Sequence, residues 1–236
     1  MHPLTPDLLT VGVLQYVVFL LSTTFHEASH AFTAKLGGDP TAFHGGQVSL
    51  NPIPHIRREP FGMVVVPLLG ILTGGGIIGW ASAPYDPNWQ LRHPRRAALM
   101  SLAGPGANFT LVILAAIAMR AGVFAGVFRP AERLSSMQLV DAATPGTWEG
   151  IAIFVSVLFS LNLLLGIFNL LPFPPLDGFT AAGILLPEGA ARRYIRFGYG
   201  LRGFSFLGLL VAWRLFGYLY RPLLLASLQL IYPGTR

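Results

Sequence analysis

An HExxH motif inside an apolar stretch of membrane-spanning length constrains this chain more than any other feature. The motif is His26-Glu27-Ala28-Ser29-His30, and it interrupts the apolar run between Leu8 and Leu36. A helix needs about 20 mainly apolar residues to cross a bilayer, and this stretch is long enough. A charge at the centre of a span costs roughly 2.5–3.5 kcal/mol, so ionisable groups there indicate a function. On a soluble helix the same residues would be ordinary solvated surface.

The spacing of the motif predicts a metal site. Residues four apart lie on one face of a helix, so the imidazoles of His26 and His30 can bind one metal ion. Glu27 lies beside them and is expected to act as general base towards a metal-bound water. The chain contains no cysteine. Thiolate ligands are therefore excluded, and His and carboxylate side chains remain as ligands.

Composition places the whole chain in the membrane class. Of 236 residues, 53% are hydrophobic and 11% are charged, outside the usual range of soluble proteins. Sixteen basic and ten acidic residues give a net charge of +6. The basic residues lie mostly at the ends of apolar segments or in loops, which favours contact with lipid headgroups over nucleic acid. We expect one integral membrane domain over residues 1–236, with a core at about 8–180 and a C-terminal helical region at about 200–232.

Four apolar segments follow the first one. Ala97–Met119 and Ile151–Leu171 are uninterrupted enough to be spans, whereas Phe61–Trp80 contains Pro67 and three consecutive glycines and is expected to be re-entrant. Phe204–Tyr232 is either one tilted span or a pair broken near Arg221-Pro222, and we favour one main span plus a short terminal helix. The predicted fold is an all-α polytopic membrane protein with about four to five transmembrane helices and a re-entrant segment.

Two shorter segments follow the first helix. Thr41–Leu50 alternates loosely and contains a glycine pair, which predicts a small surface hairpin. Asn51–His55 holds two prolines and is expected to form a rigid loop.

A catalytic zinc usually has three protein ligands, so the two histidines need a partner. The candidates are His44 and His55, in the loop after the first helix, and Asp177. Asp177 follows three prolines and is expected on extended backbone just beyond a membrane helix. Two histidines with one carboxylate is the hydrolytic pattern, and an Asp framed by prolines is a better ligand than a flexible loop His. We therefore favour Asp177.

Three motifs together resemble the site-2 proteases, which are intramembrane zinc metalloproteases. These are His26-Glu27-Ala28-Ser29-His30, Ala103-Gly104-Pro105-Gly106-Ala107-Asn108, and Asn169-Leu170-Leu171-Pro172-Phe173-Pro174-Pro175-Leu176-Asp177-Gly178. The chain is similar to the short form that lacks PDZ and CBS domains. The resemblance implies zinc bound by His26, His30 and Asp177, catalysis by Glu27, and a substrate-facing role for Asn169.

Two details qualify the resemblance. Asn169 or Asn108 could bind substrate and donate to the oxyanion, or either amide could bond helices together. Short relatives often carry Asn-Pro-x-Pro-His-x-Asp-Pro-x-Gly after the first helix, whereas here Glu59 replaces the Asp after two inserted residues. We assign no catalytic role to that loop.

The function expected from these observations is hydrolysis of peptide bonds in membrane-embedded protein substrates. A non-proteolytic membrane metal-binding protein or divalent-metal carrier is the alternative, although a carrier would not need Glu27 as a base. The expected partners are a transmembrane protein or peptide substrate and the lipid bilayer, and no oligomeric state is predicted.

The depth at which the predicted metal ligands lie in the membrane also predicts the topology. For Asp177 to meet the two histidines, the first helix and the Ile151–Leu171 helix must run in the same direction. The distribution of Lys and Arg then places the N-terminus outside and the site nearer the cytoplasmic side, in a bacterial cytoplasmic membrane.

Overall fold

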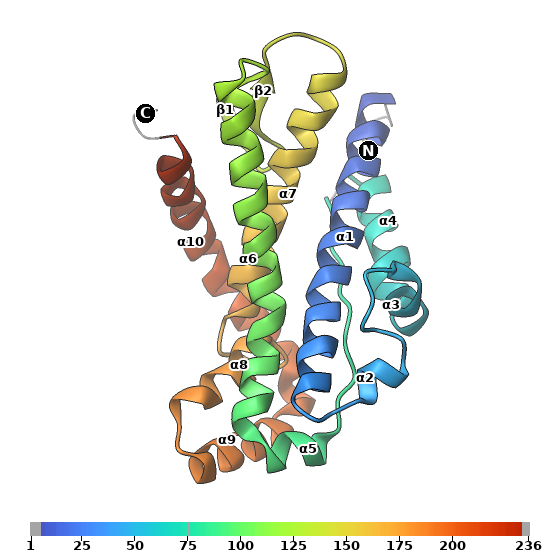
Figure 1. Ribbon diagram of the computed structural model, residues 1–236, viewed down its shortest axis with the longest axis vertical. Helices are drawn as coiled ribbons and strands as arrows, with labels where there is room; N and C mark the ends of the chain where they lie inside the picture. The colour runs from blue at the N-terminus through green and yellow to red at the C-terminus, as the bar shows by residue number, and fades with distance from the viewer. Residues whose placement is uncertain (1–5, 75, 233–236) are drawn as a thin grey trace.

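Four long helices dominate the structure (Figure 1). The computed structural model describes residues 6–74 and 76–232. In chain order the elements are α1 (Pro6–Leu36), α2 (Thr41–His44), α3 (Pro52–Arg58), the π-helix η1 (Phe61–Val65), α4 (Val66–Leu72), α5 (Pro87–Arg92), α6 (Pro94–Phe124), β1 (Phe128–Ser135), β2 (Gln138–Ala142), α7 (Thr147–Asn169), α8 (Asp177–Ala182), the 3-10 turn η2 (Gly183–Leu185), α9 (Glu188–Gly200), the 3-10 turn η3 (Arg202–Phe204) and α10 (Ser205–Ile231).

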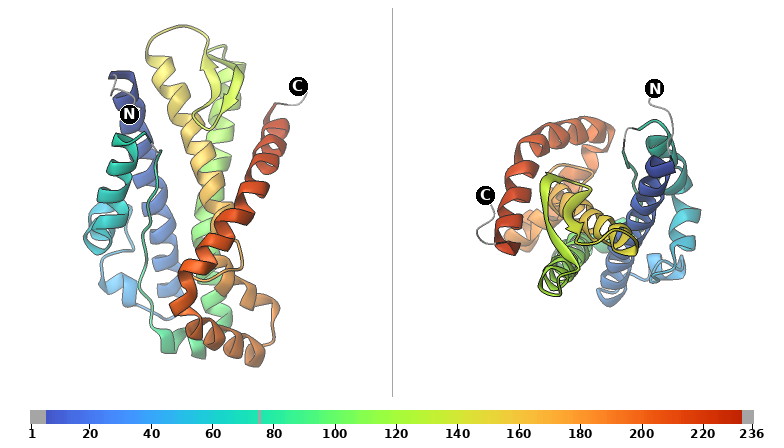
Figure 2. Two further views of the ribbon diagram at one scale, coloured as in Figure 1. Left: turned by 180° about the vertical axis from the view of Figure 1, so that it is seen from behind. Right: turned by 90° about the horizontal axis from the view of Figure 1, so that it is seen from above.

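The long helices alternate in direction. In Figure 1, α1 and α7 descend while α6 and α10 ascend, so α5, α8 and α9 gather at one end of the bundle. α6 packs against both α1 and α7, whereas α10 lies apart from α1 on the far side of α7 (Figure 2). The first helix and the helix that leads to Asp177 therefore run parallel, as the sequence predicts.

The apolar core lies where α1, α6 and α7 meet. Val18 of α1, Met119 of α6 and Phe159 of α7 are almost fully buried within one cluster. Small residues bring the helix backbones close together, as Gly166 does where it faces the Phe109 ring. This packing sets the relative positions of the polar residues on the three helices.

Three helices in the described part of the chain are long and apolar enough to cross a membrane. They are Pro94–Phe124, Thr147–Asn169 and Arg202–Ile231. α1 is as long as α6, at 31 residues each. The prediction of an all-α membrane protein is confirmed, and three of the four to five expected membrane helices are found among the described residues by this measure.

The segment Phe61–Trp80 turns back on itself. η1 and α4 run along α1, and the chain then returns in extended form towards α5 (Figures 1 and 2). The Trp80 amide donates to the Gly62 carbonyl over 3.1 Å, which places the two ends side by side. Gly74 at the turn has a φ of +71°, a conformation that glycine adopts readily. The expected re-entrant path agrees with this geometry.

A buried aspartate attaches the returning chain to the end of α1. Asp39 is 2% exposed, and its Oδ2 accepts the Asp86 amide over 2.7 Å while its Oδ1 accepts the Thr41 amide over 3.0 Å. A buried carboxylate makes strong hydrogen bonds to N–H donors, so Asp39 holds the two segments together.

The predicted hairpin at Thr41–Leu50 is wrong. That segment contains only the single helical turn α2, because a loose alternation without packing does not specify a strand. The antiparallel pair β1 and β2 instead lies in the connection after α6, with Phe128 opposite Ala142. The β2 residue Leu139 is fully buried, and its amide donates to Ser156 Oγ of α7, so tertiary contacts stabilise the pair.

Two further predictions need correction. The segment expected to be a rigid loop at Asn51–His55 opens the helix α3, because prolines in a first turn remove no helical hydrogen bond and Asn51 Oδ1 accepts the Ile53 amide. The favoured division of the C-terminal segment at Pro222 is also wrong. α10 continues through Pro222 as one helix, which corresponds to the alternative of a single span.

Candidate metal centre

Three ligand-type atoms converge between α1 and the start of α8. His26 Nε2 and His30 Nε2 lie 2.9 Å apart, and Asp177 Oδ2 lies 3.1 Å from the first and 3.2 Å from the second. Both histidines are 6% exposed. The structure therefore brings together the three residues that the sequence predicts as metal ligands.

α6 orients both imidazoles from behind. His26 Nδ1 lies 2.6 Å from Asn108 Oδ1, and His30 Nδ1 lies 2.7 Å from the Met100 carbonyl oxygen. Each partner is an acceptor, so each imidazole donates through Nδ1–H and directs the Nε2 lone pair towards Asp177. Metal-binding histidines are commonly held in this way by their second nitrogen.

The loop after α7 places Asp177. A Cβ on Gly178 would lie 2.6 Å from the Leu171 carbonyl oxygen and closer still to that of Leu170, so only glycine lets the loop fold back against the end of α7. Asp177 is the first residue of α8, with Leu176 as the extended residue before it. The expectation that Asp177 lies on extended backbone is therefore wrong, because the prolines end before it and a carboxylate is favourable in the first turn of a helix.

The electrostatics of the cluster favour a cation. Burial alone would raise the pKa of Asp177, but the charge and hydrogen bonding of His30 and His26 hold it well below its ordinary value. The ionised Asp177 carboxylate thus faces the Nε2 atoms of two imidazoles, and the Nδ1 atoms of both rings already donate hydrogen bonds. A metal ion, or a proton on one Nε2, supplies the positive charge that such a set requires.

Gly104 of α6 leaves space beside the two Nε2 atoms. A Cβ at this position would lie 2.5 Å from His26 Nε2 and 2.6 Å from His30 Cε1, and closer still to His30 Nε2. Two imidazoles and one carboxylate, with a glycine beside them, fit a hydrolytic zinc site.

Glu27 is buried beside this cluster. It is 6% exposed, and among the described residues it has no hydrogen bond or ion pair, although its charge acts on the His30 imidazole. A carboxylate without a fixed partner beside a metal site can accept a proton.

The other predicted residues divide into two groups. Both ends of the Asn108 side-chain amide are hydrogen-bonded, to His26 and to Asn162. Asn169 ends α7, and its side chain forms no hydrogen bond with a described residue. His55 is fully buried and contacts the Ser49 carbonyl over 3.1 Å, and neither it nor His44 joins the metal cluster.

Sequence reasoning missed Asn162. It assigns no role to this residue. A fully buried amide inside an apolar span needs partners, and that signal could have identified it. Met100 contributes only its carbonyl, so its side chain carries no such signal.

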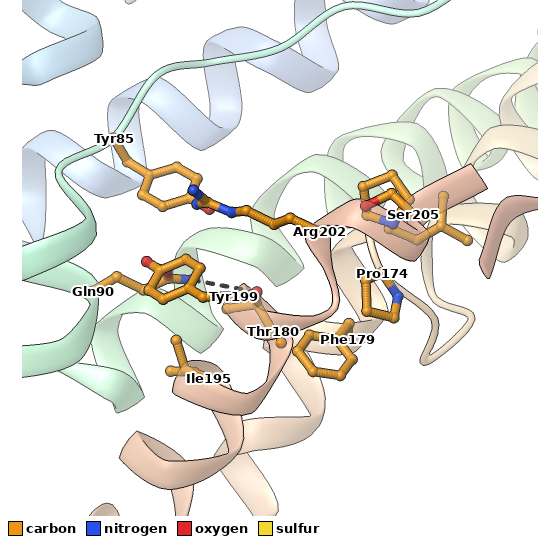
Figure 3. Close-up of a pocket in the computed structure, with 12 residues that line it drawn as sticks. Tyr85, Gln90, Pro174, Phe179, Thr180, Ile195, Tyr199, Arg202 and Ser205 are labelled. Carbon is orange, nitrogen blue, oxygen red and sulfur yellow. Dashed lines mark hydrogen bonds between the residues drawn. The ribbon is translucent and has the colours of Figure 1, made fainter. Parts of the chain in front are cut away.

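A separate cavity of about 110 Å³ is lined by residues of α5, α8 and α9 (Figure 3). Tyr199 donates to Gln90 Oε1, and Gln90 Nε2 donates to Thr180 Oγ1 over 3.3 Å. Burial raises the pKa of Tyr199 to about 12, so its hydroxyl remains a donor. The Arg202 guanidinium lies 4.3 Å from the centre of the Tyr199 ring. None of the three clustered ligands lines this cavity.

Comparison with known proteins agrees with the geometry. The sequence pattern of peptidase family M50 matches residues 15–196. The Bacillus subtilis protein named "Putative zinc metalloprotease YwhC" is 35% identical over 175 residues, which cover 73% of this chain and 69% of that protein. Proteins named "Putative zinc metalloprotease Rip2" from Mycolicibacterium smegmatis and Mycobacterium tuberculosis H37Rv are 33% and 34% identical, each covering 72% of this chain and 57% of its relative. No solved structure matches.

Proposed function

Because the chain belongs to peptidase family M50, the site-2 protease family of membrane zinc metalloproteases, we propose that it hydrolyses peptide bonds of substrates embedded in the bilayer. His26, His30 and Asp177 are the proposed zinc ligands. The observation that carries this proposal is the convergence of the two Nε2 atoms and one carboxylate oxygen within 3.2 Å of one another. A bound zinc ion would supply Lewis acidity at this point.

Glu27 is the proposed general base. Its burial without a partner among the described residues supports the transfer of a proton from the attacking water, because no competing hydrogen bond holds the carboxylate. Asn169 is the proposed substrate contact, since its amide forms no hydrogen bond with a described residue at the end of α7. The amide of Asn108 is instead occupied by His26 and Asn162.

The substrate must present an exposed peptide bond to this buried site. All carbonyls in the middle of a transmembrane helix are bonded within the helix, so the substrate has to unwind locally before attack. Segments with helix-weakening residues inside the span are therefore the expected substrates.

The site is proposed to lie nearer the cytoplasmic side of a bacterial membrane. The metal cluster is adjacent to α8, at the end of the bundle that also carries α5 and α9 (Figure 1). Basic residues concentrate in the segments at that end, which indicates the cytoplasmic face. They are Lys35, Arg92, Arg95, Arg96, Arg192, Arg193 and Arg196, and we propose that Arg57 and Arg58 of α3 face the same side. We also propose a single domain, with its catalytic core at about 8–180.

The test is the variant Glu27→Gln, assayed with a membrane-anchored model substrate and with zinc analysis of the purified protein. The amide occupies the same space but accepts no proton, so zinc should remain while cleavage falls by about 10²–10⁴-fold. Glu188→Gln, at an exposed position at the start of α9, is the matched control and should cleave normally. Undiminished cleavage by Glu27→Gln would exclude Glu27 as the base, whereas zinc binding without any cleavage by the unaltered chain would favour a metal carrier.

A further inference from the structure

A buried chain of four side chains crosses three helices behind the metal cluster. His26 of α1 contacts Asn108 of α6 over 2.6 Å, and Asn108 Nδ2 donates to Asn162 Oδ1 of α7 over 2.8 Å. Asn162 Nδ2 then donates over 2.8 Å to Ser22 Oγ, back on α1. Ser22, Asn108 and Asn162 are fully buried, so water does not compete for these bonds.

The Leu158 carbonyl fixes the direction of the whole chain. Asn162 Nδ2 also donates to Leu158 O over 2.8 Å. A backbone carbonyl only accepts, so the NH₂ of Asn162 must face it and the oxygen of Asn162 must face Asn108. Asn108 in turn presents its NH₂ to Asn162 and its oxygen to His26.

This direction determines the tautomer of His26. An amide oxygen only accepts, so the Nδ1 of His26 carries the hydrogen and its Nε2 keeps the lone pair. His30 reaches the same state through the Met100 backbone carbonyl, which no side-chain substitution removes. The tautomer of His26 alone depends on side chains.

We propose that Asn162 is a positioning residue for the metal centre, acting on His26 through Asn108 without touching the ligand itself. The proposal rests on the proposed function, in which His26 binds zinc. The competing explanation is that Asn162 only bonds α7 to its neighbours, as buried amides in membrane helices often do.

A double-substitution cycle separates the two explanations. The zinc dissociation constant is measured by chelator competition for the full chain in detergent and for Asn108→Leu, Asn162→Leu and the double variant. Loss of the partner of a metal-binding histidine costs about 10–100-fold in affinity. We expect that loss for Asn108→Leu and a rise of about 10-fold in the dissociation constant for Asn162→Leu. Because Asn162 acts through Asn108, the double variant should match Asn108→Leu within about twofold.

Two matched variants test whether loss of any buried hydrogen bond has the same effect. Ser160→Ala removes the bonds to Ser136 O and Ser156 O elsewhere on α7, and zinc affinity should not change. Ser22→Ala removes one acceptor of Asn162 but leaves Leu158 O, which alone sets the direction, so affinity should change less than about twofold. If Asn162→Leu does not fold, Asn162→Val replaces it, because its smaller apolar side chain offers no acceptor to Asn108.

The outcomes are distinct. Multiplying effects in the double variant, or unchanged zinc affinity in Asn162→Leu, would overturn the positioning role while leaving the zinc site in place. A wild-type chain that binds no zinc would refute the proposed function itself.

Discussion

Replacing Gly104 with alanine should strongly weaken zinc binding while leaving α6 intact. Ordinary contacts of a Cβ begin at 3.4 Å, whereas a Cβ on Gly104 would lie 2.5 Å from His26 Nε2, so this atom must move by about 0.9 Å. The Nδ1 bonds of 2.6 Å and 2.7 Å hold the far edges of both rings, and the rings cannot shift without losing them. Metal sites hold ligand distances within about 0.2 Å of their usual values.

We therefore expect the zinc dissociation constant of Gly104→Ala to rise by at least about 100-fold, or about 2.8 kcal/mol. Alanine favours a helix interior over glycine by about 1 kcal/mol, so stability should not fall in parallel. The assay is chelator competition on purified protein, with a thermal unfolding curve of the metal-free form.

Gly106→Ala is the matched control, because the same helix gains the same methyl group and, apart from its chain neighbours and its own helix backbone, no atom of the described residues lies within 4 Å of it. It should bind zinc and cleave substrate as the unaltered chain does. If Gly104→Ala binds zinc with unchanged affinity, the position of the ion beside Gly104 is incorrect.

Three other predictions concern ligands, stability and topology. Asp177→Ala should lower zinc content in metal analysis, whereas His55→Ala should not; the reverse result would show that the third ligand is misassigned. Asp39→Ala leaves the Asp86 and Thr41 amides without their acceptor and should lower the free energy of unfolding by about 1–3 kcal/mol in a denaturant titration. Unchanged stability would show that these hydrogen bonds do not stabilise the fold. In this cysteine-free chain, Ser136→Cys should react with a membrane-impermeant thiol reagent in intact cells and Glu188→Cys only after permeabilisation, and the opposite pattern would invert the proposed orientation.

Local rules explain which parts of the fold could be predicted. The apolar runs and the proline-glycine interruption of the re-entrant segment follow from helix length and backbone chemistry, so they are visible in the sequence. The β-hairpin after α6 is different, because its strands contain charged residues and are stabilised where Leu139 packs on α7. α3 and the continuous α10 likewise depend on caps and packing that override the usual meaning of proline.

The same division holds at the metal centre. The sequence by itself determined the ligand types, because a spacing of four residues puts two imidazoles on one helix face wherever that helix lies. Only the tertiary structure decided that Asn108 contacts His26 and that Gly104 lies against both imidazoles. The Asn108–His26 contact joins residues 82 positions apart along the chain. Both contacts depend on how α1, α6 and α7 rotate and shift against one another, and that is set by the close packing of the whole interface rather than by any local pattern.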